Sequence, residues 1–294
     1  MNTVSRIEGA LEKAVAHAHG LNEPDTPAPK KLCEAMRYAV FPGGARVRPR
    51  LSLAVSWACG DDNPELADAA AASIELLHCA SLAHDDMPCF DDALLRRGRP
   101  SVHAAYSEPL ALLAGDGLIV LAFEVLAIAG ANAPDRLAPL LRAVAAAVGM
   151  PRGIVAGQGW ESEHPVPVEA YHLSKTGSLF IGAARGGAIA AGADPEPWVS
   201  LGAHLGAAYQ AADDLRDALG TQDELGKPIG QDEVHHRPSL VTENGVESTV
   251  RRLERYVQGA IDAIPACNGR SALEKLILSE AKRLKPKSLA RAAA

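Results

Sequence analysis

Two clusters of aspartates interrupt otherwise apolar, helix-like sequence, and they constrain the fold more than any other feature. The clusters comprise Asp85, Asp86, Asp91 and Asp92 in the first half of the chain and Asp213, Asp214 and Asp217 in the second. Carboxylates in apolar surroundings are unfavourable unless cations or hydrogen-bond donors compensate their charge. Mg²⁺ prefers hard oxygen ligands and is typically bound by protein carboxylates together with the phosphate oxygens of a substrate. The pair of clusters therefore predicts bound magnesium.

The spacing within each cluster supports this interpretation. Asp213 and Asp217 are one helical turn apart, so they project from the same face of a helix. Asp85 and Asp91 would lie on different faces of an unbroken helix, but Pro88 removes a backbone donor and disrupts the preceding turn. We expect the chain to bend there and bring Asp91 back toward Asp85. A single cluster of this kind would be interpreted more simply as a solvated acidic helix end. Two clusters, each followed by basic residues, favour metal binding instead.

The composition predicts a nearly all-helical protein. Alanine and leucine dominate, the aromatic content is 4%, and runs of alternating β-branched residues are absent, so strands have little support. No long linker or repeat divides the chain, and we expect one all-α domain over residues 1–294. Helix starts are expected after Asn2, Pro29, Pro49, Pro64, Pro109, Pro134, Pro167 and Pro197, because prolines and capping residues favour first turns.

Two of the expected helices carry the aspartates. In residues 65–87 and in residues 199–219, apolar side chains recur every three or four residues and lead up to the acidic cluster on the same stripe. Packed side by side, these helices would surround a cavity with a charged mouth and an apolar shaft. Such a cavity fits a ligand with a charged head and an apolar tail.

Charge and hydropathy argue against several other classes of protein. The chain has 294 residues and a formal net charge of −7, so no general affinity for nucleic acid or anionic membranes is expected. Asp116 and Glu124 interrupt the apolar stretch 110–131, and an acidic residue at the centre of a membrane span costs roughly 2.5–3.5 kcal/mol. We expect a buried core helix there and no transmembrane segment. Five scattered cysteines and the lack of a signal-peptide core suit the cytoplasm.

Basic residues accompany the acidic clusters. Arg96 and Arg97 follow the first cluster, and Lys175 and Lys227 lie in other segments. Arginine binds phosphate oxygens through two parallel donors, and lysine adds a compact positive charge. Each residue by itself would be taken for surface charge, but their arrangement predicts the binding of a diphosphate.

Taken in order, these motifs resemble those of the trans-isoprenyl diphosphate synthases, the head-to-tail polyprenyl synthases of the bacterial geranylgeranyl or farnesyl type. The matching segments are residues 43–49, 78–98, 157–158, 175–177, 210–217 and 226–232. The resemblance implies a single-domain, all-α isoprenoid synthase bundle around a central cavity. It also implies a homodimer in the cytoplasm that uses isopentenyl diphosphate, allylic diphosphates and Mg²⁺.

The resemblance assigns roles to individual residues. The implied metal-binding residues are Asp85, Asp86, Asp91, Asp213 and Asp217. Among them Asp86 would act, like Asp214, as a supporting carboxylate behind the ligands of the magnesium ions that hold the allylic diphosphate. The implied contacts to the same diphosphate are Arg96, Lys175 and Lys227. The implied contacts to isopentenyl diphosphate are Arg48, His78 and Arg97, and the reacting region is lined by Thr176 and Gln210. In the implied reaction the allylic C–O bond ionises, the isopentenyl double bond attacks the cation, and the departed diphosphate removes a proton.

Two positions depart from the family pattern. Ala45 stands where the family usually has a lysine after Gly43 and Gly44, so one contact to isopentenyl diphosphate is missing. Arg46 has a longer reach, but neighbouring residues on a helix point in different directions. Glu161 stands where the family often has an aspartate.

Small residues below the first aspartates predict a long product. In the family a bulky aromatic five residues before the first aspartate commonly stops growth at farnesyl, whereas here that position is Ala80, beside Ser81. Geranylgeranyl diphosphate is the expected main product. The alternatives are a farnesyl diphosphate synthase and a regulatory subunit of a heteromeric prenyl synthase. Ala45 favours the regulatory subunit, and the intact acidic motifs favour catalysis. A terpene cyclase fits poorly, because it needs no second diphosphate site.

Overall fold

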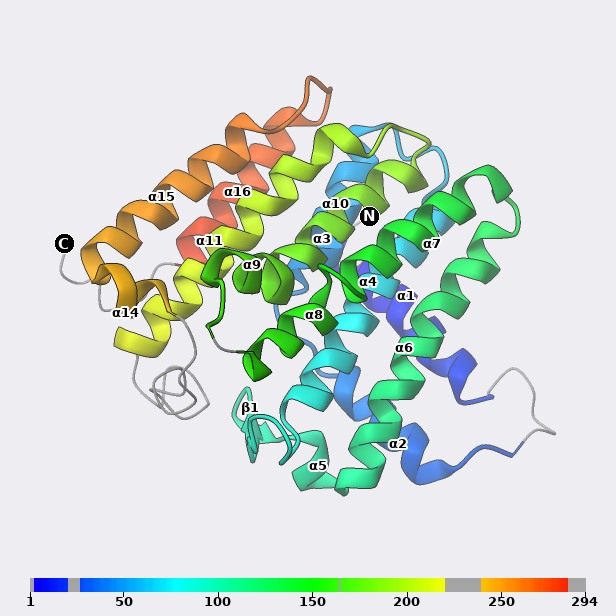
Figure 1. The fold of residues 1–294 in the computed structure, drawn as a ribbon. Coiled ribbons are helices and arrows are strands. Elements are labelled where there is room, and N and C mark those ends of the chain that lie inside the picture. The colour runs from blue at the N-terminus through cyan, green and yellow to red at the C-terminus, as the bar shows by residue number, and fades with distance from the viewer. Residues whose placement is uncertain (1–2, 21–26, 164, 220–238, 285–294) are drawn as a thin grey trace.

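The computed structural model describes residues 3–20, 27–163, 165–219 and 239–284, and this part of the chain is almost entirely helical (Figure 1). The N-terminal half contains α1 (Thr3–Ala18), α2 (Lys30–Val40), α3 (Val47–Ala58), α4 (Pro64–Asp85), β1 (Leu95–Arg96), β2 (Arg99–Pro100), α5 (Val102–Ala105), α6 (Glu108–Gly130) and α7 (Pro134–Val148). The C-terminal half contains α8 (Ile154–Gly159), η1 (Trp160–Ser162), α9 (Val168–His172), η2 (Leu173–Gly177), α10 (Ser178–Ala190), η3 (Glu196–Trp198), α11 (Val199–Leu219), α14 (Leu240–Asn244), α15 (Val246–Asp262) and α16 (Arg270–Leu284). The predicted all-α fold is confirmed.

Prolines mark most of the expected helix starts. Pro64 is the first residue of α4, and the preceding Asn63 side chain accepts a hydrogen bond from the Leu66 amide. The expected start after Pro49 is wrong, because α3 begins at Val47 and Pro49 sits in its first turn, where a missing amide donor costs nothing. Helices α8, α10, α15 and α16 have no proline at their starts, which explains why the sequence pattern did not indicate them.

The two aspartate-bearing helices were both expected. Helix α11 has the predicted bounds, whereas α4 ends at Asp85, two residues earlier than expected. Beyond it the chain turns back on itself, and the Asp91 amide donates to the Asp85 carbonyl over 3.0 Å. The predicted bend at Pro88 is therefore confirmed, and it places two aspartates of the first cluster next to each other.

Helices α4 and α10 form the centre of the bundle. Helix α4 packs against α3, α6 and α10, and α10 packs against α3, α7 and α11 as well. Small alanine and glycine residues dominate the buried faces of both helices and allow the close approach of their neighbours. Helices α15 and α16 cover α11 and α3 on the side shown at the upper left of Figure 1.

A short hairpin follows the first aspartate cluster and is the exception to the helical fold. Strands β1 and β2 pair antiparallel, with Arg96 opposite Arg99. The two residues between them have positive φ angles, 56° at Arg97 and 77° at Gly98, as a two-residue type I′ turn requires. The hairpin thus carries Arg96 and Arg97 on a rigid support near the end of α4.

Helix α6 is less buried than expected. Both α4 and α6 are long and apolar enough to cross a membrane, a property that core helices of globular proteins share. The apolar window of α4 is 78% buried, but that of α6 is only 39% buried. The prediction of a buried core helix is therefore wrong for one face of α6, which exposes Leu112, Leu113, Val120 and Ile128.

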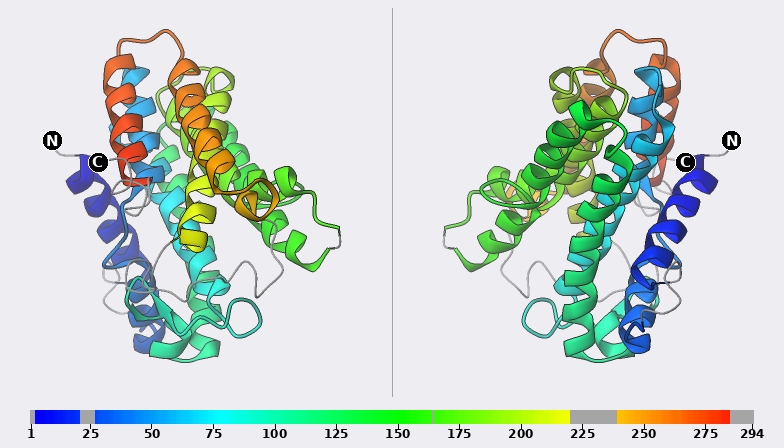
Figure 2. Two further views of the ribbon diagram at one scale, coloured as in Figure 1. Left: turned by 90° about the vertical axis from the view of Figure 1, so that its left-hand side faces the viewer. Right: turned by 90° about the vertical axis from the view of Figure 1, so that its right-hand side faces the viewer.

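The segment that carries α8, η1 and α9 stands out from one side of the bundle (Figure 2). In Figure 1 it lies in front of the space between α4 and α11. The segment then returns to the bundle through η2, a single π-helical turn that packs against α8 and α11. Single π turns are frequent at functional sites.

Candidate active site

A cavity of about 1130 Å³ opens between α4, α8, η2 and α11. At one end it is lined by apolar side chains, which include Leu77, Ala80, Ile119, Val148, Ile154 and Leu179. At the other end it is lined by charged side chains, which include Asp85, Asp91, Arg96, Lys175, Asp213 and Asp217. The structure therefore contains the predicted cavity with a charged mouth and an apolar shaft.

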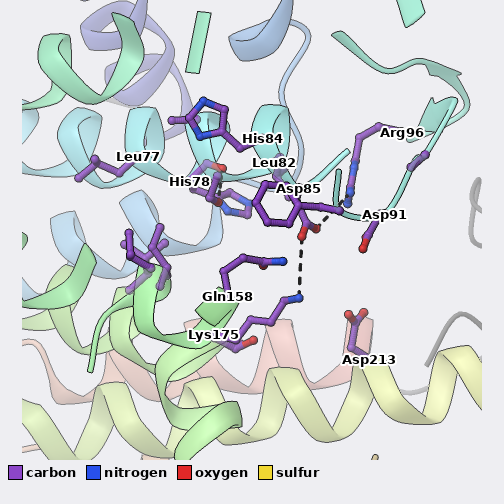
Figure 3. Close-up of a pocket in the computed structure, with 18 of the residues that line it drawn as sticks. Leu77, His78, Leu82, His84, Asp85, Asp91, Arg96, Gln158, Lys175 and Asp213 are labelled. Carbon is purple, nitrogen blue, oxygen red and sulfur yellow. Dashed lines mark hydrogen bonds and ion pairs between the residues drawn. The ribbon is translucent and has the colours of Figure 1, made fainter. Parts of the chain in front are cut away.

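The two aspartate clusters face each other across the charged end. Asp85, the last residue of α4, lies beside Asp91, and the Asp213 carboxylate points toward them from α11 (Figure 3). Within the described residues no group of three or more His, Cys, Asp or Glu side chains converges on one point. This arrangement fits Mg²⁺, which is bound by one or two carboxylates together with substrate phosphate oxygens rather than by an all-protein cage.

Asp86 does not line the cavity. Its carboxylate is buried and accepts hydrogen bonds from the Arg96 guanidinium, which lies 3.6 Å from Asp85 as well. Because its oxygens already accept from Arg96, Asp86 is placed to support the metal-binding aspartates rather than to bind a magnesium ion directly. Its position matches the supporting role, in which it orients Arg96 toward the cavity.

Lys175 projects from the π turn η2 into the charged end of the cavity. Its ammonium group pairs with Glu161 and lies 3.8 Å from the Asp85 carboxylate (Figure 3). Helix α8 packs directly on the backbone of this turn, since a Cβ atom on Gly157 would come within 2.4 Å of the Lys175 Cα atom. Only glycine permits that approach, and the close packing fixes the position of the Lys175 Cα atom.

A chain of hydrogen bonds connects η2 to α11. Thr176 donates to the Gln210 side-chain carbonyl over 2.7 Å, and the Gln210 amide donates to Asp214 over 2.8 Å. The second Asp214 oxygen accepts from the Leu240 amide over 2.7 Å. Burial raises the pKa of Asp214 to about 6. Thr176 and Gln210 line the cavity, whereas Asp214 is buried behind them.

A second basic cluster lies beside the first aspartates. Arg48 stacks over the Phe180 ring at 4.6 Å, and its guanidinium lies 3.3 Å from the His78 Nε2 atom. Burial and the neighbouring arginines lower the pKa of His78 well below its usual value, so the ring is neutral and accepts this bond. Arg97 packs against Gly44, where a Cβ atom would clash with its guanidinium. Arg48 and His78 line the cavity, whereas Arg97 does not line it but lies close enough for its charge to lower the pKa of His78.

Arg46 does not replace the missing lysine at Ala45. Its guanidinium points into the protein, where it pairs with Glu8 and Glu75 over 2.8 Å and donates to the Val40 carbonyl over 2.9 Å. The residue is 3% exposed and adopts a left-handed backbone conformation just before α3. Its charge is therefore used for packing and does not reach the cavity.

Both residues expected to control product length line the apolar shaft. Ala80 is 1% exposed to solvent, and Ser81 turns its hydroxyl back to the His78 carbonyl. Leu77 lies one turn earlier on the same helix and also lines the shaft. The small side chain at position 80 leaves this level of the shaft open.

The sequence pattern did not indicate some of the residues that shape the cavity. His84, Phe90 and Tyr171 line it, and Glu161 contacts Lys175 from behind. The four-residue spacing of Tyr171 and Lys175 was the available signal, because it puts both on one helical face. Lys227, expected to bind the allylic diphosphate, lies outside the described residues.

The sequence is similar to those of known prenyl synthases. The sequence profile of the family described as polyprenyl synthetase matches residues 29–267. A geranylgeranyl diphosphate synthase of Cereibacter sphaeroides is 55% identical over 285 residues, which cover 97% of this chain and 97% of the relative. A farnesyl diphosphate synthase of Geobacillus stearothermophilus is 35% identical over 268 residues, 86% of each chain.

A similar fold is found among solved structures. A geranyltransferase from Helicobacter pylori, complexed with magnesium and isoprenyl diphosphate, superposes with a TM-score of 0.78 at 26% identity. The match covers 96% of this chain and 98% of that one.

Proposed function

Because this chain belongs to the polyprenyl synthetase family, we propose that it is a magnesium-dependent prenyltransferase that condenses isopentenyl diphosphate with allylic diphosphates, with geranylgeranyl diphosphate as its main product. The observation that carries this proposal is a cavity that combines facing carboxylates at its mouth with an apolar shaft below. A second basic cluster beside the mouth supplies the site for the second diphosphate.

The residues around the mouth have distinct tasks in the proposed reaction. Asp85 and Asp91 on one side, and Asp213 and Asp217 on the other, would hold the magnesium ions. When bound, these ions neutralise the charge that develops on the leaving diphosphate. Lys175 donates to the same diphosphate as the allylic C–O bond breaks and its electron pair passes to the diphosphate oxygen.

The second basic cluster orients the nucleophile. Arg48, His78 and Arg97 hold isopentenyl diphosphate so that its C4 carbon bonds to the allylic C1 carbon. The product cation then loses a proton from C2 to the departed diphosphate. The apolar walls of the shaft exclude water, which would otherwise capture the cation.

Two alternatives are tested by one experiment. The purified chain is incubated alone with labelled isopentenyl diphosphate, an allylic diphosphate and Mg²⁺, and the dephosphorylated products are separated by chromatography. Geranylgeraniol as the main product supports the proposal. A profile that ends at farnesol supports a farnesyl diphosphate synthase, and no turnover without a partner chain supports a regulatory subunit.

Ala45 offers a test of the second diphosphate site. Ala45 adjoins Gly44, which packs against the Arg97 guanidinium, and Arg46 is buried elsewhere. Ala45→Lys is expected to lower the KM for isopentenyl diphosphate by up to about tenfold, because one charge-assisted bond is worth roughly 1.4 kcal/mol. The KM for the allylic substrate should barely move, and Ala45→Gln serves as the uncharged control. An unchanged isopentenyl KM in the lysine variant would mean that the site is already complete.

The exposed face of α6 supports the proposal of a homodimer. Four large apolar side chains on this helix are uncovered, and an apolar patch of that kind on a protein surface marks an interaction site. Leu113→Glu combined with Val120→Glu is expected to give a monomer in light scattering, since buried like charges oppose self-association. Leu278→Glu, on the exposed face of α16, is the matched control and should leave the dimer intact. A wild-type chain that is monomeric at micromolar concentration would contradict this assignment.

We also propose that the chain forms one catalytic domain and acts in the cytoplasm. The cavity draws on both α4 and α11, which lie in different halves of the sequence. The five cysteines are unpaired, as suits a reducing compartment.

A further inference from the structure

Lys175 is held from behind by a carboxylate that belongs to neither aspartate cluster. Its ammonium group pairs with the Glu161 Oε1 atom, and Glu161 itself is only 16% exposed. On the other side the ammonium group faces Asp85 at 3.8 Å, across the charged end of the cavity. The lysine therefore lies between one carboxylate in the wall and one at the site of the proposed chemistry.

Uncharged donors hold Glu161 in the wall. The Tyr171 hydroxyl donates to its Oε1 atom over 2.8 Å, and the Gln158 side-chain amide donates to its Oε2 atom over 3.1 Å. Tyr171 is 4% exposed, and its ring also lies near the lysine ammonium group, at 5.7 Å. With both oxygens bound, the carboxylate is held in the wall behind the lysine.

The backbone of Lys175 is also fixed. The π turn η2 and the close contact at Gly157 set the position of its Cα atom, so the side chain has little freedom once its end is anchored. An ammonium group has three donors. One donor can stay on Glu161 while the others turn toward a phosphate oxygen on the Asp85 side.

We propose that Glu161, held by Tyr171 and Gln158, is a positioning residue that keeps the Lys175 ammonium group aimed at the diphosphate leaving group while the allylic C–O bond breaks. The inference rests on the proposed function and adds to it the residues that align its lysine. A donor held in place before the reaction acts on the transition state more than on ground-state binding. Loss of Glu161 should therefore lower kcat more than it raises the allylic KM.

The test compares variants of the full chain. Glu161→Gln keeps the size and removes the charge, and we expect kcat to fall roughly 10- to 100-fold, as is typical when a residue that orients a catalytic group is lost. Tyr171→Phe should lower kcat by roughly tenfold. In the double variant Tyr171→Phe should have almost no further effect, because its hydroxyl acts through the Glu161 carboxylate. Glu161→Asp retains the charge and should keep more activity than Glu161→Gln.

Two controls separate this role from a structural one. Glu163→Gln makes the same substitution at an exposed position two residues away and should leave kcat unchanged. Calorimetric binding of inorganic diphosphate with Mg²⁺, and the isopentenyl KM, should change less than threefold in all variants, and their unfolding temperatures should match the wild type within about 3 °C.

The outcomes distinguish this inference from the proposed function. A wild-type chain without any prenyl transfer would overturn the function itself. If the wild type is active and the Glu161→Gln variant has an unchanged kcat, Glu161 does not position the lysine and the inference alone is overturned. A faster variant would overturn it too, since Glu161 would then compete with the substrate for the lysine. Additive effects of Tyr171→Phe and Glu161→Gln would also overturn it.

Discussion

Asp213→Ala and Asp85→Ala variants are each expected to lose prenyl transfer by about a thousandfold or more, while their unfolding temperatures stay close to that of the wild type. Activity should fall because each aspartate is one of the four carboxylates at the mouth that are proposed to hold the magnesium ions. Stability should hold because the Asp213 side chain is 59% exposed and its ion pair with Arg216, at 3.9 Å, is long and solvated.

Asp85 should also be dispensable for folding. Its partner Arg96 keeps the buried Asp86, and Lys175 keeps Glu161, so neither cation is left unpaired. Removing one of several crowded carboxylates also relieves repulsion within the first cluster.

The measurement is an initial rate over a series of magnesium concentrations, together with a thermal unfolding curve. Binding of magnesium and inorganic diphosphate by calorimetry shows whether loss of activity follows loss of metal. Asp135→Ala, at an exposed position in the first turn of α7 and outside the cavity, is the matched control and should keep the wild-type rate. Near-normal turnover of either test variant at limiting magnesium would contradict the assignment of the metal site.

Ala80→Tyr is expected to switch the main product from geranylgeranyl to farnesyl diphosphate. The Ala80 side chain lines the apolar shaft on α4, five residues before Asp85, which lines the charged mouth. An open shaft accepts a growing chain at about 0.8 kcal/mol per buried methylene group, whereas a phenol ring at this level would block it. Because Ala80 is only 1% exposed, a thermal unfolding curve checks that the tyrosine variant still folds.

Chromatography of the dephosphorylated products decides this prediction. Ala80→Ser keeps a small side chain at the same position and should leave the product profile unchanged. If Ala80→Tyr gives the wild-type profile, a residue other than Ala80 sets the product length. A wild-type profile that already ends at farnesol would remove Ala80 as the residue that sets product length.

Much of the site follows from local sequence. The apolar stripes and the four-residue spacing of Asp213 and Asp217 predicted α11 with its observed bounds, because helical periodicity depends only on near neighbours. Pro88 predicted the turn that brings Asp91 to Asp85 for the same reason. The all-α fold and the charged mouth above an apolar shaft could therefore be predicted before the structure was known.

The tertiary structure decided which charges reach the cavity. Arg46 and Asp86 carry the same kinds of charge as the residues at the mouth, yet burial pairs Arg46 with Glu75 and Asp86 with Arg96. Glu161 was visible in the sequence only as a departure from a family pattern, and its contact with Lys175 depends on α8 packing over η2. The exposed face of α6 was likewise hidden in an apolar stretch that looked like core. Hydropathy and spacing determine which segments form helices, whereas the pairing of each charge depends on distances between segments far apart in the chain, which only the packed bundle sets.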